Sequence, residues 1–313
     1  MKNILITGGA GFIGSNLTKS IYAHNDSSIS CVDNLSTSSK KNIINFIHNN
    51  HYTFIEKDIN EPISFDNRKI KEIYHLACPA SPLQYQKHPL RTLNTSFIGT
   101  KNILDIAVMN KSKLLFTSTS EVYGDPNINP QNESYWGNVN MLGPRACYDE
   151  GKRAAETLCY EYKNEFEIDI KIVRLFNTYG PNMAIKDGRL ISNIIVQALK
   201  GDDLTIFGDG KQTRSFCFVD DLVSGLQLAM KSNDFNNPIN LGNPHEVQIL
   251  EVVSLIREMT NSTSNIVFME TAIDDPRQRR PDISKAKKYL NWEPKIDLKS
   301  GLKQTIEYFD SIL

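Results

Sequence analysis

The sequence predicts an α/β protein built on a doubly wound parallel sheet, with a smaller, interleaved α/β lobe. The first observation is that short, nearly continuous apolar segments alternate with longer stretches of helical periodicity. Continuous apolar segments are typical of strands buried on both faces, and their alternation with helices predicts βαβ units. The second is a glycine-rich loop placed between the first apolar segment and the first helical stretch. The third is the length of 313 residues, which allows a large core.

The expected strands of the main sheet come in sequence with helices between them. The strands cover residues 3–7, 28–32, 52–56, 72–77, 113–118 and 168–175. The intervening helical stretches include Gly14–His24, Pro89–Met109 and Tyr148–Phe166. This order predicts a parallel sheet with helices on both faces.

After residue 181 the pattern loosens, which indicates a second lobe. A helix is expected at Arg189–Lys200, another in "DDLVSGLQLAM", and one more core strand at 238–243. The tail from Glu246 to Leu313 mixes helices with a basic segment. We therefore expect residues 1–180 plus about 214–242 to form the first domain, and about 181–213 plus 243–313 the second.

The composition excludes several classes of protein. A formal net charge of -1 provides no basic field for nucleic acid or an anionic membrane surface. The five cysteines contain no C-x-x-C pair, and the six histidines show no metal-ligand spacing, so we expect reduced thiols and no metal site. No segment approaches the ~20 apolar residues of a membrane-spanning helix, and the N-terminus lacks a signal peptide's long apolar stretch.

The glycine-rich loop "TGGAGFIG" indicates a dinucleotide site of the Rossmann type. Gly8, Gly11 and Gly14 are three apart, directly after a strand and at the start of a helix, where a backbone without side chains can approach a pyrophosphate. Such a loop alone also fits a plain strand-to-helix turn. Asp33 ends the second strand and favours NAD over NADP, because its carboxylate accepts bonds from ribose hydroxyls and repels a 2′-phosphate. Asp58 ends the third strand and is expected near the adenine.

A tyrosine and a lysine in "ACYDEGKRAAE" are candidates for proton transfer. Tyr148 and Lys152 are four residues apart, so they share one face of the predicted helix. An ammonium group beside a phenol is expected to lower the pKa of the tyrosine toward neutrality and make it a proton acceptor. The same spacing also occurs in ordinary solvated pairs. The strand-end segment "TSTSEVYG" (117–124) adds Thr119 and Glu121, and that carboxylate has a plain alternative as a cap for backbone N–H groups.

Together these motifs resemble the extended short-chain dehydrogenase/reductase family that acts on nucleotide sugars, and within it the UDP-glucuronate decarboxylases (UDP-xylose synthases). The segments that carry the resemblance span nearly the whole chain: "GGAGFIGSNL", "HLACPASP", "TSTSEVYGDP", "GPRACYDEGKR", "RLFNTYGPNM", "LTIFGDGKQTRSF", "NLGNPHEVQILE" and "DDPRQRRPDISKAK". The resemblance implies an NAD-binding Rossmann domain, a nucleotide-sugar-binding domain and a homodimer. Membrane-anchored relatives carry an added N-terminal segment; this chain begins at the first strand, so we expect a cytoplasmic enzyme.

The resemblance also implies roles for particular residues. The catalytic set is Thr119, Glu121, Tyr148, Lys152 and Arg279. The NAD-binding set is Gly8, Gly11, Phe12, Ile13, Gly14, Asp33, Asn34, Thr37, Asp58, Ile59, Leu76, Ala77, Thr95, Tyr148 and Lys152. The set expected to bind the UDP-sugar is Asn177, Arg189, Ile206, Phe207, Arg214 and Arg279, whereas Arg277 and Arg280 fit solvated surface charges equally well.

The implied reaction oxidises C4 of UDP-glucuronate, loses CO2 from the resulting β-keto acid and reduces C4 again to give UDP-xylose. Ser120 favours this reaction over 4,6-dehydration, because the related dehydratases carry an aspartate there to protonate a leaving hydroxyl. A serine is not acidic enough for that step at neutral pH. The alternatives are a nucleotide-sugar 4,6-dehydratase or 4-epimerase and, with less support, a non-catalytic NAD-sensing protein, which commonly lacks the Tyr/Lys pair.

Overall fold

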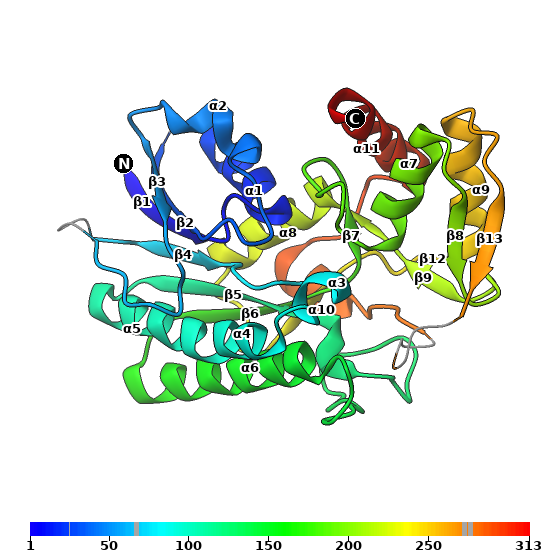
Figure 1. Cartoon of the computed structure of the whole chain (residues 1–313). Helices are drawn as coiled ribbons and strands as arrows, with labels where there is room; N and C mark the ends of the chain where they lie inside the picture. The colour runs from blue at the N-terminus through cyan, green and yellow to red at the C-terminus, as the bar shows by residue number, and fades with distance from the viewer. Residues whose placement is uncertain (25, 66–68, 271–273, 275–277) are drawn as a thin grey trace.

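A computed structural model of the chain describes residues 1–24, 26–65, 69–270, 274 and 278–313. The N-terminal half and the C-terminal part form two lobes that lie side by side (Figure 1).

The main sheet is parallel and doubly wound, which confirms the predicted fold class. Its strand order is β11-β6-β5-β4-β1-β2-β3, so the chain starts in the middle and extends the sheet in both directions. All six neighbouring pairs are parallel. The strands are β1 (Lys2–Thr7), β2 (Ser27–Asp33), β3 (Tyr52–Glu56), β4 (Glu72–His75), β5 (Lys113–Thr119), β6 (Ile170–Leu175) and β11 (Ile239–Leu241).

Helices cover both faces of this sheet (Figure 1). One face carries α1 (Phe12–Tyr22), the short α2 (Ile44–Ile47) and α8 (Val219–Lys231), with α1 packed on α8. The other carries α3 (Pro82–Tyr85), α4 (Pro89–Asn94), α5 (Thr100–Asn110) and α6 (Ala146–Phe166). In α6 the buried positions recur every three or four residues, which turns one stripe of the helix toward the sheet.

The helix expected at Pro89–Met109 is present but not uniform. It consists of α4, a π-helical turn at Thr95–Gly99 and α5. Both neighbours of the turn remain helical, so the chain continues in one direction past it. Gly99 belongs to this turn and packs closely on the facing loop, where a Cβ would lie 2.6 Å from the end of the Ile59 side chain.

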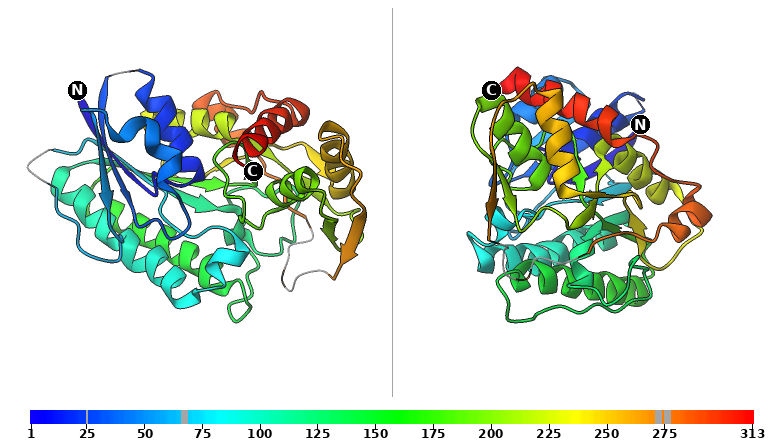
Figure 2. Two further views of the ribbon diagram at one scale, coloured as in Figure 1. Left: turned by 45° about the horizontal axis from the view of Figure 1, so that its top comes forward. Right: turned by 90° about the vertical axis from the view of Figure 1, so that its right-hand side faces the viewer.

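Outside the main sheet, the described residues form three two-stranded sheets, and Figure 2 shows the second lobe from two further sides. β8 (Leu204–Phe207) pairs with β13 (Ile266–Met269), β9 (Thr213–Ser215) with β12 (Glu246–Gln248), and β7 (Thr178–Tyr179) with β10 (Cys217–Phe218). Helices α7 (Leu190–Lys200), α9 (Ile249–Met259) and α11 (Leu298–Ile312) contact one another in the second lobe, whereas α10 (Ser284–Leu290) contacts β11 and α8 of the first lobe.

One continuous apolar core joins the two lobes. It includes Ile6 and Leu17 from the main sheet and α1 together with Ile194 and Val252 from α7 and α9, all fully buried. A second cluster fills the face between the sheet and helices α5 and α6. Within the described ranges, no helix combines the length and apolar character needed to cross a bilayer.

Candidate active site

A cavity of about 560 Å³ extends from the carboxyl ends of the main-sheet strands to the second lobe. Ligands of open α/β sheets bind at this edge. The lining brings together 21 of the residues expected from the sequence: Gly8, Gly11, Phe12, Ile13, Gly14, Asp33, Asn34, Thr37, Ile59, Leu76, Ala77, Thr95, Thr119, Glu121, Tyr148, Lys152, Asn177, Arg189, Phe207, Arg214 and Arg279.

Two expected residues are not part of the cavity lining. Ile206 is fully buried, because its position in β8 turns the side chain into the core, whereas Phe207 beside it is half exposed and does line the cavity. Asp58 accepts hydrogen bonds from Arg91 Nη2 (2.9 Å) and Asn34 Nδ2 (3.0 Å). Arg91 and Asn34 themselves line the cavity, so Asp58 acts by holding two residues that do.

The glycine-rich loop has the close approaches that a dinucleotide site needs. Gly8 has a φ of 71° and donates its N–H to Val32 O at 2.8 Å, where any Cβ would lie 2.9 Å from Ala77. A Cβ on Gly14 would lie 2.2 Å from Gly8 O. Helix α1 starts within this loop, with Gly11 as its N-cap and Phe12 as its first residue. Its first residues, Phe12, Ile13 and Gly14, line the cavity, and the first N–H groups of a helix have no partner within the helix, which suits a pyrophosphate.

Asp33 is buried at the end of β2 and orders the turn around it. Its Oδ2 accepts from Ala10 N (3.0 Å), and its Oδ1 accepts from Leu35 N (2.9 Å) and Ser38 Oγ (2.7 Å). These bonds fix the carboxylate at the cavity wall. A carboxylate oxygen has two lone pairs, so Oδ2 retains acceptor capacity for a ribose hydroxyl.

Tyr148 and Lys152 lie on the buried face of α6 and both line the cavity. The Tyr148 ring stacks in parallel on Tyr85, with ring centroids 5.0 Å apart, and its hydroxyl is hydrogen-bonded to Thr119. Lys152 Nζ donates to Thr117 O at 2.8 Å and lies 4.6 Å above the centre of the Phe116 ring. The phenol and the ammonium group are therefore each held by strand β5.

The expected fall in the Tyr148 pKa is wrong for this structure. Burial raises the pKa of Tyr148 well above its ordinary value, and the hydrogen bond from Thr119 offsets this only in part. Lys152 is also buried, which lowers the pKa of its ammonium group. The spacing of the two residues predicted that their side chains share one face of the helix, but it did not reveal that both are buried. Burial disfavours the charged form of each side chain.

Glu121 is held between two arginines. Both Nη atoms of Arg279 donate to the carboxylate of Glu121. Nη1 bonds to Oε1, and Nη2 bonds to Oε2 at 2.9 Å. Arg145 Nη2 donates to the same Oε2 at 2.8 Å. The backbone N–H of Glu121 bonds to Thr119 Oγ1 at 3.2 Å, so Thr119 and not Glu121 provides the cap of the short 3-10 helix Ser120–Tyr123.

The two arginines determine the charge of Glu121. Burial alone would raise the pKa of this carboxyl, but Arg279 and Arg145 together lower it to about 2. Asp149, next to Tyr148, shows the opposite effect, because burial and the negative Glu121 raise its pKa to about 8. At neutral pH, Glu121 is thus ionised and Asp149 is mostly protonated.

The arginines expected to bind the diphosphate lie at the second-lobe end of the cavity. Arg189 caps the start of α7 and pairs with Asp187 through Nε (2.5 Å) and Nη2 (2.8 Å). Arg214 is in β9 and donates to Thr213 O at 2.9 Å. Arg280 pairs loosely with Glu246 at 3.8 Å outside the lining, and Arg277 lies outside the described residues. Among the described residues, no group of three or more His, Cys, Asp or Glu side chains is placed to hold a metal ion.

Arg145 is the site residue that sequence reasoning missed. It precedes Tyr148 by three positions, and this spacing places both side chains on one face of a helix. The motif "GPRACYDEGKR" therefore contained the signal. What the sequence could not provide was the long-range partner, because Glu121 reaches Arg145 only after β5 and α6 pack together.

Comparison with known proteins identifies relatives over almost the whole chain. The sequence model of the GDP-mannose 4,6 dehydratase family matches residues 5–305. UDP-glucuronic acid decarboxylase 1 of Danio rerio is 50% identical over 308 residues, covering 98% of this chain and 72% of the relative. UDP-glucuronic acid decarboxylase 3 of Arabidopsis thaliana is 50% identical over 299 residues, covering 96% and 86%.

Solved structures match the fold at lower identity. UDP-glucuronic acid 4-epimerase of Bacillus cereus, in complex with UDP-glucuronic acid and NAD, superposes with a TM-score of 0.89 at 29% identity and covers 99% of this chain and 100% of that one. UDP-glucose 4-epimerase of Thermotoga maritima, solved with UDP-glucose, gives a TM-score of 0.88 at 29% identity, with 99% of each chain covered.

Proposed function

The chain belongs to the extended short-chain dehydrogenase/reductase family described by the GDP-mannose 4,6 dehydratase model, and we propose that it is an NAD-dependent UDP-glucuronate decarboxylase. The proposed reaction converts UDP-glucuronate to UDP-xylose and CO2. The observation that carries the proposal is the cluster of Glu121, Arg145 and Arg279 beside Tyr148, a site whose arginines suit a sugar carboxylate.

The first part of the cavity fits NAD. The glycine loop leaves no room for a Cβ at Gly8 or Gly14, and the start of α1 presents free N–H groups to a pyrophosphate. Asp33 at the cavity wall favours a ribose with free hydroxyls over a 2′-phosphate. Bound NAD supplies a hydride acceptor for C4 and returns the same hydride later, so the reaction has no net oxidation.

The oxidation step assigns one proton transfer to Tyr148. In its phenolate form, Tyr148 takes the proton of the C4 hydroxyl as the C4 hydride leaves and so becomes a neutral phenol, and Thr119 holds the two oxygens in line. The high pKa of Tyr148 means that the phenolate forms only when a positive charge is brought close to it. Within the chain we assign this charge to Lys152, which lies one helical turn after Tyr148 and is anchored on Thr117 O.

The decarboxylation step follows from the ketone at C4. The C5–carboxylate bond breaks to release CO2, and its electron pair moves to the C4 oxygen as an enolate, which Tyr148 stabilises by returning a hydrogen bond. The enolate then takes a proton at C5 from solvent water, and Tyr148 returns its proton to the C4 oxygen when the hydride comes back to C4. Because its pKa is about 2, Glu121 is an acceptor that orients Arg279 beside the ring and not itself a proton donor.

Ser120 distinguishes this reaction from 4,6-dehydration. Its side chain is buried and lines the cavity next to Glu121. A dehydration at C6 needs an acid to protonate the leaving hydroxyl, which a serine does not supply at neutral pH. Loss of CO2 needs no such acid.

We also propose that one domain binds NAD and the other binds the nucleotide sugar. Residues 1–180 with about 214–242 form the NAD-binding domain, and about 181–213 with 243–313 form the nucleotide-sugar-binding domain. In support, β11 extends the main sheet and α8 packs on α1. We assign the UDP group to the other end of the cavity, which Arg189, Phe207 and Arg214 line.

The assembly that we propose is a homodimer in the cytoplasm. Exposed apolar side chains gather along helices α4 to α6, where Leu90, Phe97 and Tyr160 are 77%, 43% and 59% exposed. These helices lie beside one another on the outer face of the sheet (Figure 1). All five cysteines are free thiols, as in a reducing compartment. Light scattering of the purified protein tests the dimer.

The experiment that tests the proposed function is incubation of the purified protein with UDP-glucuronate. Mass spectrometry is expected to detect UDP-xylose and CO2 in equal amounts without added reductant. Formation of UDP-galacturonate would instead indicate a 4-epimerase, and unchanged substrate would contradict both activities.

A further inference from the structure

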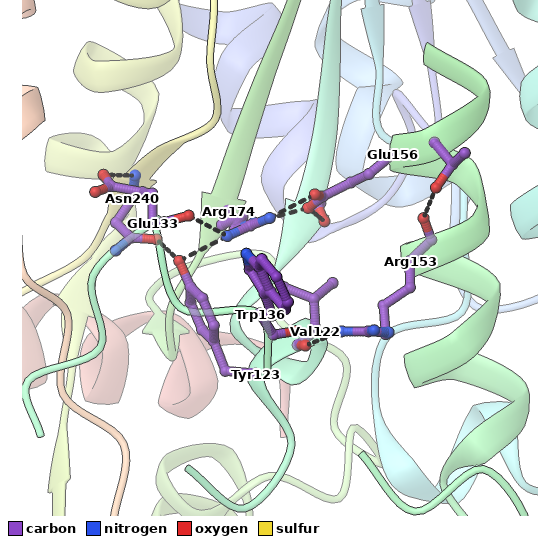
Figure 3. A network of polar contacts seen from close by, with 10 residues as sticks. Val122, Tyr123, Glu133, Trp136, Arg153, Glu156, Arg174 and Asn240 are labelled. Atoms are coloured by element: carbon purple, nitrogen blue, oxygen red, sulfur yellow. Dashed lines mark hydrogen bonds and ion pairs between the residues drawn. The ribbon is translucent and has the colours of Figure 1, made fainter. Parts of the chain in front are cut away.

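A buried polar network behind the cavity connects the segments that carry the proposed catalytic residues (Figure 3). At its centre lies Arg174, in β6. Its guanidinium makes a bidentate ion pair with Glu156 of α6, in which Nε donates to Oε1 at 2.9 Å and Nη2 donates to Oε2 at 2.7 Å. Arg174 does not line the cavity, so the proposed reaction gives it no direct role.

The first branch of the network fixes the oxidation half of the site. Glu156 follows Lys152 by one helical turn, and its Oε1 also accepts from Ser118 Oγ at 2.5 Å. Ser118 directly precedes Thr119 at the end of β5. The Arg174–Glu156 pair therefore joins three neighbouring elements, α6, β5 and β6, at the level of Thr119 and Lys152.

The second branch passes through Tyr123. Arg174 Nη1 donates to the Tyr123 hydroxyl at 3.0 Å, and this hydroxyl donates to Asn240 Oδ1 at 2.8 Å. The guanidinium also lies 4.9 Å over the Tyr123 ring. Tyr123 is the last residue of the 3-10 helix that contains Glu121, two residues earlier.

Asn240 carries the connection to Arg279. Its Nδ2 donates to Gln131 O (3.0 Å) and to Asp282 O (3.1 Å). Gln131 makes two hydrogen bonds with the backbone of Arg280, each at 2.8 Å. Gln131 N donates to Arg280 O, and Arg280 N donates to Gln131 Oε1. The backbone next to Arg279 is thus held by residues that Asn240 positions.

We propose that Tyr123 is a positioning residue, whose hydroxyl sets the Glu121–Arg279 pair relative to Tyr148, Thr119 and Lys152. The inference rests on the proposed function for its catalytic meaning. Tyr123 and Asn240 are 1% and 0% exposed, so water does not replace a lost bond between them. The hydroxyl stays neutral throughout the working range, because burial raises the pKa of Tyr123 to about 12.

The variant Tyr123→Phe tests this with a change of one oxygen atom. We expect kcat for UDP-xylose formation to fall about tenfold or more, since one buried acceptor loses its donor. KM for UDP-glucuronate should stay within about twofold, because Asn177, Arg189 and Arg214 lie outside the network. A larger share of product should leave as the 4-keto sugar, since steps at C5 suffer more than oxidation at C4.

Tyr135→Phe is the matched control. This neighbouring tyrosine stacks near Tyr123 with ring centroids 6.2 Å apart, but its hydroxyl only accepts from Asn127 N at 3.1 Å. The kcat and the product ratio of the Tyr135→Phe variant should equal those of the wild type. If Tyr123→Phe matches this control, or loses kcat and C4 oxidation in equal proportion, the inference is overturned.

A double-mutant cycle separates this inference from the proposed function. Unfolding by urea is measured for Tyr123→Phe, Arg279→Lys and both together, which requires no turnover. Coupling of about threefold or more in the unfolding equilibrium constant supports the link, and the same cycle with Tyr135→Phe should be additive. Additivity in both cycles overturns the inference even if the wild type makes UDP-xylose. Coupling without UDP-xylose refutes only the function.

Discussion

Replacing Glu121 by glutamine removes the negative charge between Arg145 and Arg279. The pKa of Glu121 falls from an ordinary 4.5 to about 2, because the stabilisation by the two arginines exceeds the cost of burial. By linkage, this difference corresponds to about 3 kcal/mol of folding free energy at neutral pH. The glutamine amide has one acceptor oxygen in place of two, so it cannot accept all the hydrogen bonds of Arg279 and Arg145. We therefore expect Glu121→Gln to destabilise the protein by about this amount.

The stability difference between wild type and Glu121→Gln depends on pH, because the pKa of Glu121 differs between the folded and unfolded protein. The pKa of Glu121 is lowered in the folded protein, so its stabilisation is complete above about pH 4.5 and is lost as the pH falls toward 2. The stability gap between wild type and Glu121→Gln should therefore shrink as the pH falls from about 5 to about 3.5. The expected decrease is about 1 kcal/mol.

Urea unfolding followed by the fluorescence of Trp292, which is buried, measures this gap. Glu150→Gln is the matched control on α6, because Glu150 forms an exposed pair with Arg153 at 3.4 Å and should cost less than ~1 kcal/mol. A gap below ~1 kcal/mol for Glu121→Gln, or one that does not change between pH 5 and 3.5, would refute the account of this cluster.

Three further predictions concern activity. Tyr148→Phe removes the proton acceptor at C4 and should lower kcat by about 10²- to 10⁴-fold, and UDP-xylose formation near the wild-type rate would contradict its role. Asp33→Asn removes the charge that repels a 2′-phosphate, so the ratio of NADP to NAD dissociation constants should fall at least about tenfold in a fluorescence titration; an unchanged ratio would show that another group selects the cofactor. Arg145→Gln should lower kcat/KM for UDP-glucuronate by about tenfold or more, through loss of a charge-assisted hydrogen bond, whereas the exposed Arg280→Gln should have little effect.

Local patterns predicted the fold and most of the lining of the cavity. The spacing of Gly8, Gly11 and Gly14 predicts a tight turn without side chains, and a Cβ at Gly8 or Gly14 would indeed meet backbone atoms of the protein. Strand boundaries followed from continuous apolar segments, because a strand buried on both faces leaves no room for polar residues. These properties depend on neighbours in sequence, so they are visible without a structure.

The features that sequence reasoning missed depend on neighbours in space. The pKa of Tyr148 is set by desolvation, which spacing along a helix does not reveal. The side chain of Ile206 is buried in the core, because alternation along β8 turns it there, so the contact with uracil that the resemblance implies is left to its backbone. The partners of Arg145 and Tyr123 come from segments 24 and 117 residues away, so only the folded chain identifies them.

The most direct test of the central claim uses UDP-glucuronate carrying deuterium at C4 and ¹³C in the carboxylate, in ordinary water. The account predicts that ¹³CO2 is released and that UDP-xylose retains the deuterium at C4, because the hydride that leaves C4 returns to it. UDP-xylose without deuterium at C4, or an intact ¹³C carboxylate in UDP-galacturonate, would contradict the claim.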